Sequence, residues 1–292
     1  MNEVVRLAIG GPVAIGARAS ATLTDLLATS GITVAHTGSV VLDWPSQTLP
    51  FSASAWEALD TLEADPIAFA FHHLTARSTT GVWQNPVDAA RALVGDWVAA
   101  ERLRVTPPWP GGATCAIALV HEAQAIAPPR TGFLRKLRRS TPSNPFAAYT
   151  ELAAIEKQYR ATAALRSIDL LEPEQQARIR MLGFSLGAGV GIQIAGRPGF
   201  RRGTAFPSRG FDTAGDRPTD TIEFPLLDDT VSDGLAALLS VGGAAALSVP
   251  IERFGGEHGP AELVLYDELL SRLDAAGVWL TTPEAIVERL YP

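Results

Sequence analysis

The chain has 292 residues, of which 47% are hydrophobic and 19% are charged. This length suits one large or two smaller domains, and the hydrophobic content is ordinary for a globular protein with a sizeable core. With 24 basic and 31 acidic residues the formal charge is −7, which argues against nucleic acid as a partner.

Cysteine use and hydropathy predict a cytoplasmic protein without a membrane span. The single cysteine, Cys115, stands in an apolar run and is expected to be a buried thiol. One cysteine allows neither a disulfide framework nor a cysteine zinc site. The first apolar run is too short for a signal peptide, and no run approaches the roughly 18 apolar residues of a spanning helix.

The first 110 residues predict a small α/β domain. Asp65 and Pro66 have the residue types of a helix N-cap and first helical position, so a helix is expected to begin there. His72 and His73 fall inside that apolar helix, where packing is favoured over metal binding. Strands are expected over 4–10 and 32–36, and further helices over 20–30, 54–63 and 86–103.

The segment 106–112, TPPWPGG, predicts a domain boundary because three prolines and two glycines break helices and sheet ladders. We therefore expect an N-terminal domain over 1–110 and a second domain over 111–292. Beyond the boundary, strands and helices alternate. Strands are expected over 115–120, 161–165, 189–195, 221–227, 244–251 and 278–280, and helices over 145–159, 173–182, 232–239, 260–275 and from 283 onward.

This alternation predicts a parallel sheet or barrel with helices outside it. In such folds the chemistry lies at the carboxyl ends of the strands. The residues that follow strands are His121, Glu122, Arg166, Glu252 and His258.

The stretch 199–230 is dense in turn-forming residues, and we expect a long polar loop followed by one strand. Loops of this length are usually functional. The stretch carries paired arginines and separated acids, which are Arg201, Arg202, Asp212, Asp216, Asp228 and Asp229.

Several segments carry a resemblance to a known family. They are YRATAAL, GFRRGTAFPSRGFD with DRPTDTIEFPLLDDT, the closing IERFGGEHGPAELVLYDELLSRLDAAGVWLTTPEAI, and DPIAFAFHHLT near the N-terminus. Together they resemble a bacterial branch of the polysaccharide deacetylase (NodB-like) superfamily. The resemblance implies an α/β fold with a small N-terminal α/β domain and a distorted, shortened (β/α) barrel.

The sequence departs from this family where the family binds its metal. Two aspartates end the first barrel strand in the family, whereas this chain reads His121-Glu122-Ala123-Gln124. The two histidines of the second motif have no counterpart in the matching LGFSLGAGVGIQ. Because a divalent ion needs its donors at fixed positions, we expect no catalytic metal and no cofactor.

The resemblance implies roles for the residues that remain. Glu122 takes the place of the family's base, Arg201 or Arg202 that of its third-motif arginine, and His258 that of its late histidine. We therefore expect Glu122, His258 and Arg202 at catalytic positions. Substrate-binding positions are expected at His121, Gln124, Arg201, Asp212 and Arg166.

The expected function is that of a catalytically degenerate, deacetylase-like protein that binds a carbohydrate or a protein partner in a polysaccharide pathway. A metal-independent carbohydrate hydrolase, a deacylase or glycosidase using Glu122 and His258, stays open as an alternative, as does an interaction scaffold. Two weaker patterns are a GFSLG nucleophile-elbow match at Ser185 and a basic run over 130–139. Most such basic runs are solvated faces, and the functional alternatives are binding of an acidic glycan, a phosphate or an anionic lipid headgroup.

Overall fold

The structure is a computed structural model. It describes residues 4–9, 13–30, 33–39, 53–58, 61–75, 86–100, 108–123, 146–187, 191–194, 204–211, 218–227, 232–255 and 258–291.

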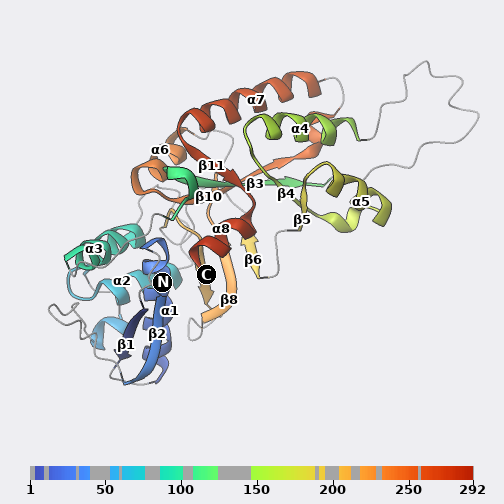
Figure 1. The fold of residues 1–292 in the computed structure, drawn as a ribbon. Coiled ribbons are helices and arrows are strands. Elements are labelled where there is room, and N and C mark those ends of the chain that lie inside the picture. The colour runs from blue at the N-terminus through green and yellow to red at the C-terminus, as the bar shows by residue number, and fades with distance from the viewer. Residues whose placement is uncertain are drawn as a thin grey trace, which may run out of the picture.

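In its described residues, the N-terminal part has two parallel strands and three helices (Figure 1). Strand β1 (Val4–Ile9) pairs with β2 (Thr33–Ser39), and α1 (Val13–Leu27) connects them through the 3-10 turn η1 (Ala28–Ser30). Helices α2 (Pro66–Thr75) and α3 (Pro86–Ala100) pack on α1. Their shared core contains Leu23, Leu27 and Phe71.

The predicted start of α2 is confirmed. Asp65 Oδ1 accepts hydrogen bonds from the backbone N–H groups of Ile67 (3.1 Å) and Ala68 (2.9 Å), as an N-cap does. Its other oxygen accepts one from Trp56 Nε1 at 3.2 Å. The helix predicted over 54–63 is wrong: it is reduced to the 3-10 turn η2 (Ala53–Trp56) and a turn over 62–64, a geometry in which Trp56 reaches Asp65.

The larger part is built around strand β3 (Cys115–Glu122), the centre of a six-stranded sheet. On one side β3 pairs in parallel with β10 (Ala244–Pro250). On the other side it pairs with β11 (Val278–Thr281) along its first half and with β4 (Ala164–Arg166) at its end. Strand β5 (Ser185–Leu186) extends the sheet beyond β4, and β9 (Leu226–Leu227) extends it beyond β10.

Helices cover both faces of this sheet. Helices α4 (Ala147–Gln158) and α7 (Gly259–Ala275) lie on one side and α8 (Pro283–Leu290) lies on the other (Figure 1). The other described helices of this part are α5 (Pro173–Met181) and α6 (Ser232–Val241). The expected α/β class with a mostly parallel central sheet is confirmed. Within the described residues the sheet has two ends, β5 and β9, so barrel closure stays a prediction.

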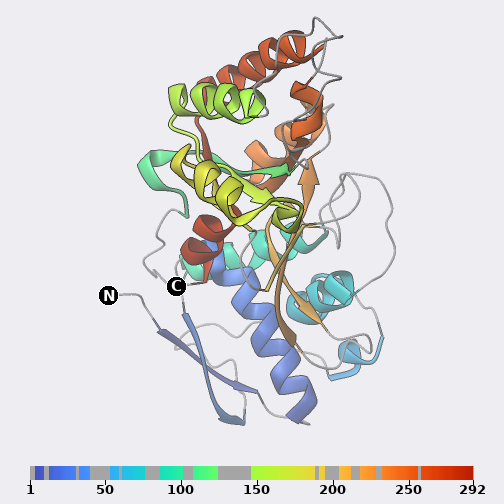
Figure 2. The ribbon, with the colours of Figure 1, turned by 90° about the vertical axis from the view of Figure 1, so that its right-hand side faces the viewer.

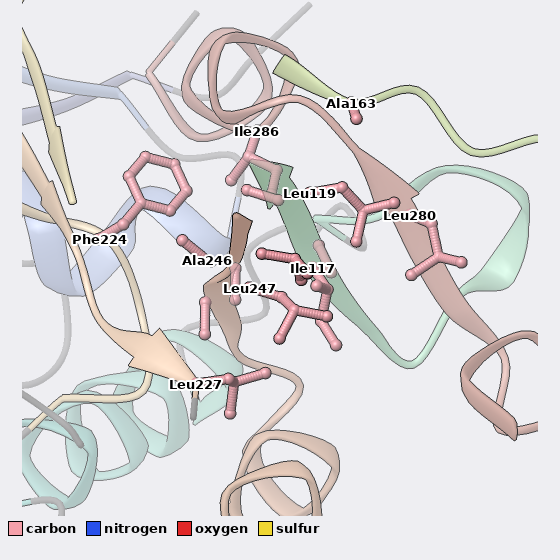
Figure 3. Close-up of a cluster of buried hydrophobic side chains, with 14 of the residues drawn as sticks. Ile117, Leu119, Ala163, Phe224, Leu227, Ala246, Leu247, Leu280 and Ile286 are labelled. Carbon is pink, nitrogen blue, oxygen red and sulfur yellow. The ribbon is translucent and has the colours of Figure 1, made fainter. Parts of the chain in front are cut away.

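Burial on both faces explains the apolar sequence of β3, CAIALVHE. Ile117 and Leu119 pack with Leu247 of β10, Leu280 of β11 and Ile286 of α8 (Figure 3). Each such side chain contributes about 1.5–3 kcal/mol when it leaves water.

Cys115 is a buried free thiol, as predicted. Burial raises its pKa to about 12, so the thiol stays protonated near neutral pH.

A second, three-stranded sheet occupies much of the stretch expected as a loop. Strand β8 (Pro218–Phe224) pairs in parallel with β6 (Ile192–Ile194) and antiparallel with β7 (Ser208–Phe211). The expectation of a long loop with one strand over 221–227 is therefore corrected to β7, β8 and β9. In Figure 2 the orange strand β8 runs alongside α1.

The predicted boundary coincides with an irregular segment. Residues 110–112 form the 3-10 turn η3 (Pro110–Gly112), in which Gly111 and Gly112 have positive φ. Trp109 Nε1 donates to the carbonyl of Gly242 at 2.7 Å. Buried hydrophobic residues form two clusters, one in the N-terminal helices and one around β3, but the division into two domains at 110 stays a prediction.

Gly243 provides a test of the packing at the start of β10. A Cβ on Gly243 would lie 2.5 Å from the carbonyl oxygen of Ala205 and 3.0 Å from its Cβ. Because these atoms cannot yield without backbone movement, Gly243→Ala is expected to lower the free energy of unfolding by about 1–3 kcal/mol in urea denaturation.

Gly95→Ala is the matched control, since a Cβ there meets nothing within 4 Å. In the interior of α3 this change is expected to stabilise by about 0.5–1 kcal/mol. Equal effects of the two substitutions would contradict the close packing of Gly243.

Candidate functional site

Three adjacent parallel strands end at the same edge of the central sheet. In the strand register Glu122 of β3 lies beside Arg166 of β4 on one side and beside Pro250 of β10 on the other. The sequence-based expectation that polar residues gather at these strand ends is therefore met for Glu122 and Arg166.

Glu122, Arg166 and Ser167 form a half-exposed polar group, here called the Glu122 cluster. Ser167 Oγ donates to Glu122 Oε2 at 2.8 Å, and Arg166 Nη1 lies 3.4 Å from Glu122 Oε1. The side chains of Arg166 and Glu122 are 39% and 35% exposed. Both carboxylate oxygens are thus oriented by neighbours while the group keeps access to solvent.

Ser167 was not predicted from the sequence. Its backbone has φ 54°, in the left-handed region that non-glycine residues rarely adopt. The pairing of β3 and β4 ends just before it, with Ala123 N donating to Arg166 O at 3.0 Å. Its place directly after a strand is the one sequence signal that could have identified it.

His121 precedes Glu122 in the sequence but points to the opposite face of the sheet, as successive strand residues do. The ring is fully buried. Nδ1 lies 3.0 Å from the carbonyl oxygen of Val249 and must donate to it, because a carbonyl only accepts. Nε2 lies 2.6 Å from Glu156 Oε1.

Glu156 of α4 also accepts a hydrogen bond from the Tyr266 hydroxyl of α7 at 3.0 Å. Burial and the neighbouring Glu156 raise the pKa of Tyr266 well above its ordinary value, so the phenol keeps its proton. The three side chains tie β3, β10, α4 and α7 together, and the structure does not bring His121 into the Glu122 cluster.

His258 stands at the N-cap of α7 with an exposed side chain. Its carbonyl accepts from the N–H groups of Ala261 and Glu262, at 3.1 Å each. The 3-10 turn η7 (Ile251–Phe254) leads from the end of β10 toward this position, so His258 follows the same sheet edge. Among the described residues, no hydrogen bond or ion pair joins His258 to the Glu122 cluster.

The other predicted site residues lie outside the described residues. They are Gln124, Arg201, Arg202 and Asp212, together with Asp216, Asp228, Asp229 and the basic run 130–139.

Two weaker sequence patterns are decided by the structure. Ser185 opens strand β5 after helix α5, whereas a nucleophile elbow lies at the end of a strand and opens a helix, so the elbow interpretation is wrong. His72 Nε2 lies 2.6 Å from the carbonyl of Ala55, which confirms the packing interpretation of this histidine.

Within the ranges that the structure describes, no three His, Cys, Asp or Glu side chains gather as a metal site would require. In the same ranges, no helix has both the length and the apolar character needed to cross a bilayer.

Comparison of the chain with models of protein families, with curated proteins and with solved structures gives no match. The resemblance to polysaccharide deacetylases therefore stays a prediction.

Glu156→Ala tests the buried connection between His121 and Tyr266. It leaves an imidazole nitrogen and a phenol without a partner, so the free energy of unfolding is expected to fall by about 3–5 kcal/mol. Glu151→Ala, at an exposed position of the same helix, is the control and is expected to change it by less than about 0.5 kcal/mol. Similar losses in chemical denaturation for both variants would rule out the buried contacts as the cause.

Proposed function

We propose that the chain is a catalytically degenerate relative of polysaccharide deacetylases that binds a carbohydrate at the carboxyl edge of its central sheet. The observation that carries the proposal is the Glu122 cluster, a half-exposed carboxylate held by Arg166 and Ser167 where three parallel strands end.

The chemistry of this cluster suits sugar hydroxyls. A hydroxyl both donates and accepts, and Glu122 accepts while Arg166 retains further N–H donors beyond the one that faces Glu122. Hydrogen bonds to charged groups contribute about 1.5–3 kcal/mol each, roughly twice those between neutral groups. Mutual contact also orders both side chains before a ligand arrives, which lowers the entropic cost of binding.

The proposal of lost catalysis rests on the sequence. Gln124 stands where the resembled family has an anionic ligand, and LGFSLGAGVGIQ has no histidine for the second motif. Glu122 stands where that family has its base, with a side chain one methylene longer than aspartate. The longer arm moves the carboxylate relative to any bound substrate.

The alternative is a metal-independent hydrolase that uses Glu122 and His258. It is favoured by one observation, that β10 and η7 lead to His258 from the same edge at which Glu122 ends β3. For this reaction Glu122 and His258 must reach the same bond, as an acid and base pair does.

Binding can be measured by calorimetry with N-acetylglucosamine oligomers, their deacetylated forms and uronic acid oligomers. Glu122→Gln and Arg166→Ala are expected to weaken binding by about 10–100-fold, because each removes a charged hydrogen-bonding group. Glu174→Gln, at an exposed position of α5, is the control and is expected to leave the affinity unchanged. If none of the oligomers binds the wild-type chain, the carbohydrate proposal fails and the interaction scaffold takes its place.

Acetate release from the same oligomers separates binding from catalysis. No release is expected, with or without added Zn²⁺. Release that is lost in both Glu122→Gln and His258→Ala would establish the hydrolase alternative instead.

A further inference from the structure

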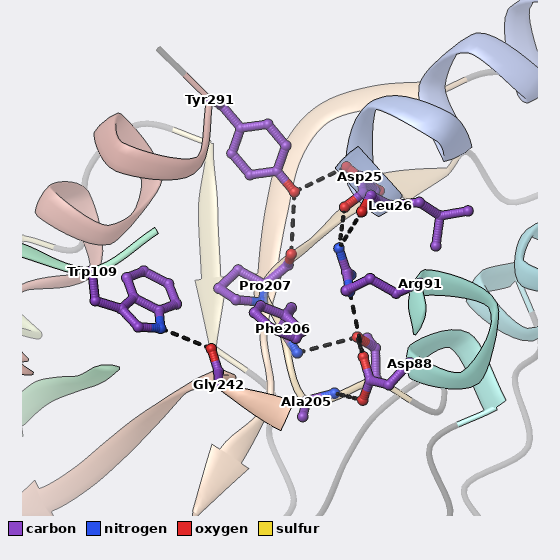
Figure 4. A network of polar contacts seen from close by, with 11 residues as sticks. Asp25, Leu26, Asp88, Arg91, Trp109, Ala205, Phe206, Pro207, Gly242 and Tyr291 are labelled. Atoms are coloured by element: carbon purple, nitrogen blue, oxygen red, sulfur yellow. Dashed lines mark hydrogen bonds and ion pairs between the residues drawn. The ribbon is translucent and has the colours of Figure 1, made fainter. Parts of the chain in front are cut away.

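The buried carboxylate of Asp25 joins three elements that are distant in the sequence (Figure 4). Asp25 lies on α1 and is 1% exposed. Its Oδ2 accepts from the backbone N–H of Arg209 on β7 at 2.9 Å, and its Oδ1 lies 2.9 Å from the hydroxyl of Tyr291 at the end of α8. The same hydroxyl lies 3.1 Å from the carbonyl oxygen of Pro207.

Counting protons decides how these groups pair. The Tyr291 hydroxyl has one hydrogen. When Asp25 is ionised, this hydroxyl can donate either to the carboxylate or to the Pro207 carbonyl, and the other acceptor lacks a hydrogen bond from Tyr291. With a proton on Oδ1, Asp25 donates to Tyr291 and Tyr291 donates to Pro207. Only the protonated acid satisfies all three groups, and an unsatisfied buried acceptor is costly.

The nearby guanidinium groups do not replace that proton. Arg91 of α3 donates from Nη1 to the backbone carbonyls of Asp25 and Leu26, and its Nε lies 3.6 Å from Asp88 Oδ1. Its guanidinium also stacks over the Phe206 ring, 4.3 Å from the centroid. Arg209 reaches Asp25 through its backbone N–H, and its buried Nε has no hydrogen-bond partner among the described residues.

These surroundings set the balance between the two forms of Asp25. Burial raises its pKa to about 6, and the Arg209 N–H, the Tyr291 hydroxyl and the charges of Arg209 and Arg91 oppose this only in part. Asp88 lies one turn from Arg91 on the same helix, α3, and is the acidic neighbour of that guanidinium. The titratable residues on the other elements packed against α1 are Arg6 on β1, His36 on β2, His72 and His73 on α2, and Asp220 and Glu223 on β8.

We propose that Asp25, Tyr291 and the Pro207 carbonyl form a proton-dependent latch, closed when Asp25 is protonated and loosened when it ionises. Closed, the latch fastens α1 to β7 and to the carboxyl end of α8. It acts between the N-terminal helices and the rest of the chain, and it is independent of any ligand at the Glu122 cluster.

The direction of the pH effect follows from the two pKa values of Asp25. In the opened state the carboxyl is hydrated and has its ordinary value of 3.8, whereas in the closed state the value is about 6. The closed state therefore holds the proton more tightly, and opening becomes easier as pH rises from 3.8 to 6. Above about pH 6 the opening equilibrium no longer changes with pH.

Amide hydrogen exchange of the wild-type chain tests the latch. The exchange of the Arg209 amide, whose N–H faces Asp25, is measured at pH 5.0 and pH 7.5 and corrected for the intrinsic pH dependence of exchange. The opening equilibrium is expected to be about tenfold larger at pH 7.5 than at pH 5.0. It rises about tenfold per pH unit up to the closed-state pKa of about 6, which lies about one unit above pH 5.0. The ¹³C signal of the Asp25 carboxyl gives its midpoint directly, expected about two units above that of exposed aspartates.

Asp25→Asn mimics the protonated acid, because its amide donates to Tyr291 and its oxygen accepts from Arg209. The corrected opening equilibrium of this variant at pH 7.5 is expected to equal that of the wild type at pH 5.0. Tyr291→Phe is expected to speed exchange at both pH values. The controls Asp96→Asn, exposed on α3, and Tyr159→Phe, whose hydroxyl bonds Asp267, are expected to behave as the wild type.

Two results would overturn the latch. One is a corrected opening equilibrium in the wild type that is equal at pH 5.0 and 7.5. The other is a carboxyl midpoint for Asp25 near that of exposed aspartates, which is informative even if Asp25→Asn does not fold.

Discussion

The larger part of the molecule depends on strand β3, which is hydrogen-bonded along both edges and buried on both faces. A strand in this position can carry a polar side chain only where a partner meets it or where it reaches solvent. His121 and Glu122 show the two solutions on consecutive residues. His121 finds Glu156 and Val249 inside the protein, and Glu122 emerges at the strand end beside Arg166.

Much of the fold could be predicted because its elements have strong local signals. Period and capping residues located α2, α7 and α8, and the apolar run of CAIALVHE located β3. Strand β7 could not be predicted, since four residues that include a glycine and an arginine become a strand only through pairing with β8. Its existence is a tertiary effect, which propensity does not capture.

The candidate site was predictable in location and less so in composition. Strand alternation indicated which edge of the sheet to consider, and Glu122 and Arg166 do meet there. Successive side chains of a strand point to opposite faces, so His121 and Glu122 are separated although they are neighbours in the sequence. The prediction of one site for both residues does not take this alternation into account. Asp25 could not be identified from the sequence, because its role comes from contacts with Arg209 and Tyr291, which lie 184 and 266 positions away.

The passage from β8 to β9 has a mechanical consequence. A single residue, Pro225, separates the two strands, and its carbonyl accepts a hydrogen bond from Ala246 of β10 at 2.8 Å. The two sheets thus share one nearly continuous length of chain. A displacement of β8, which lies against α1, is therefore expected to displace β9 and its partner β10 as well.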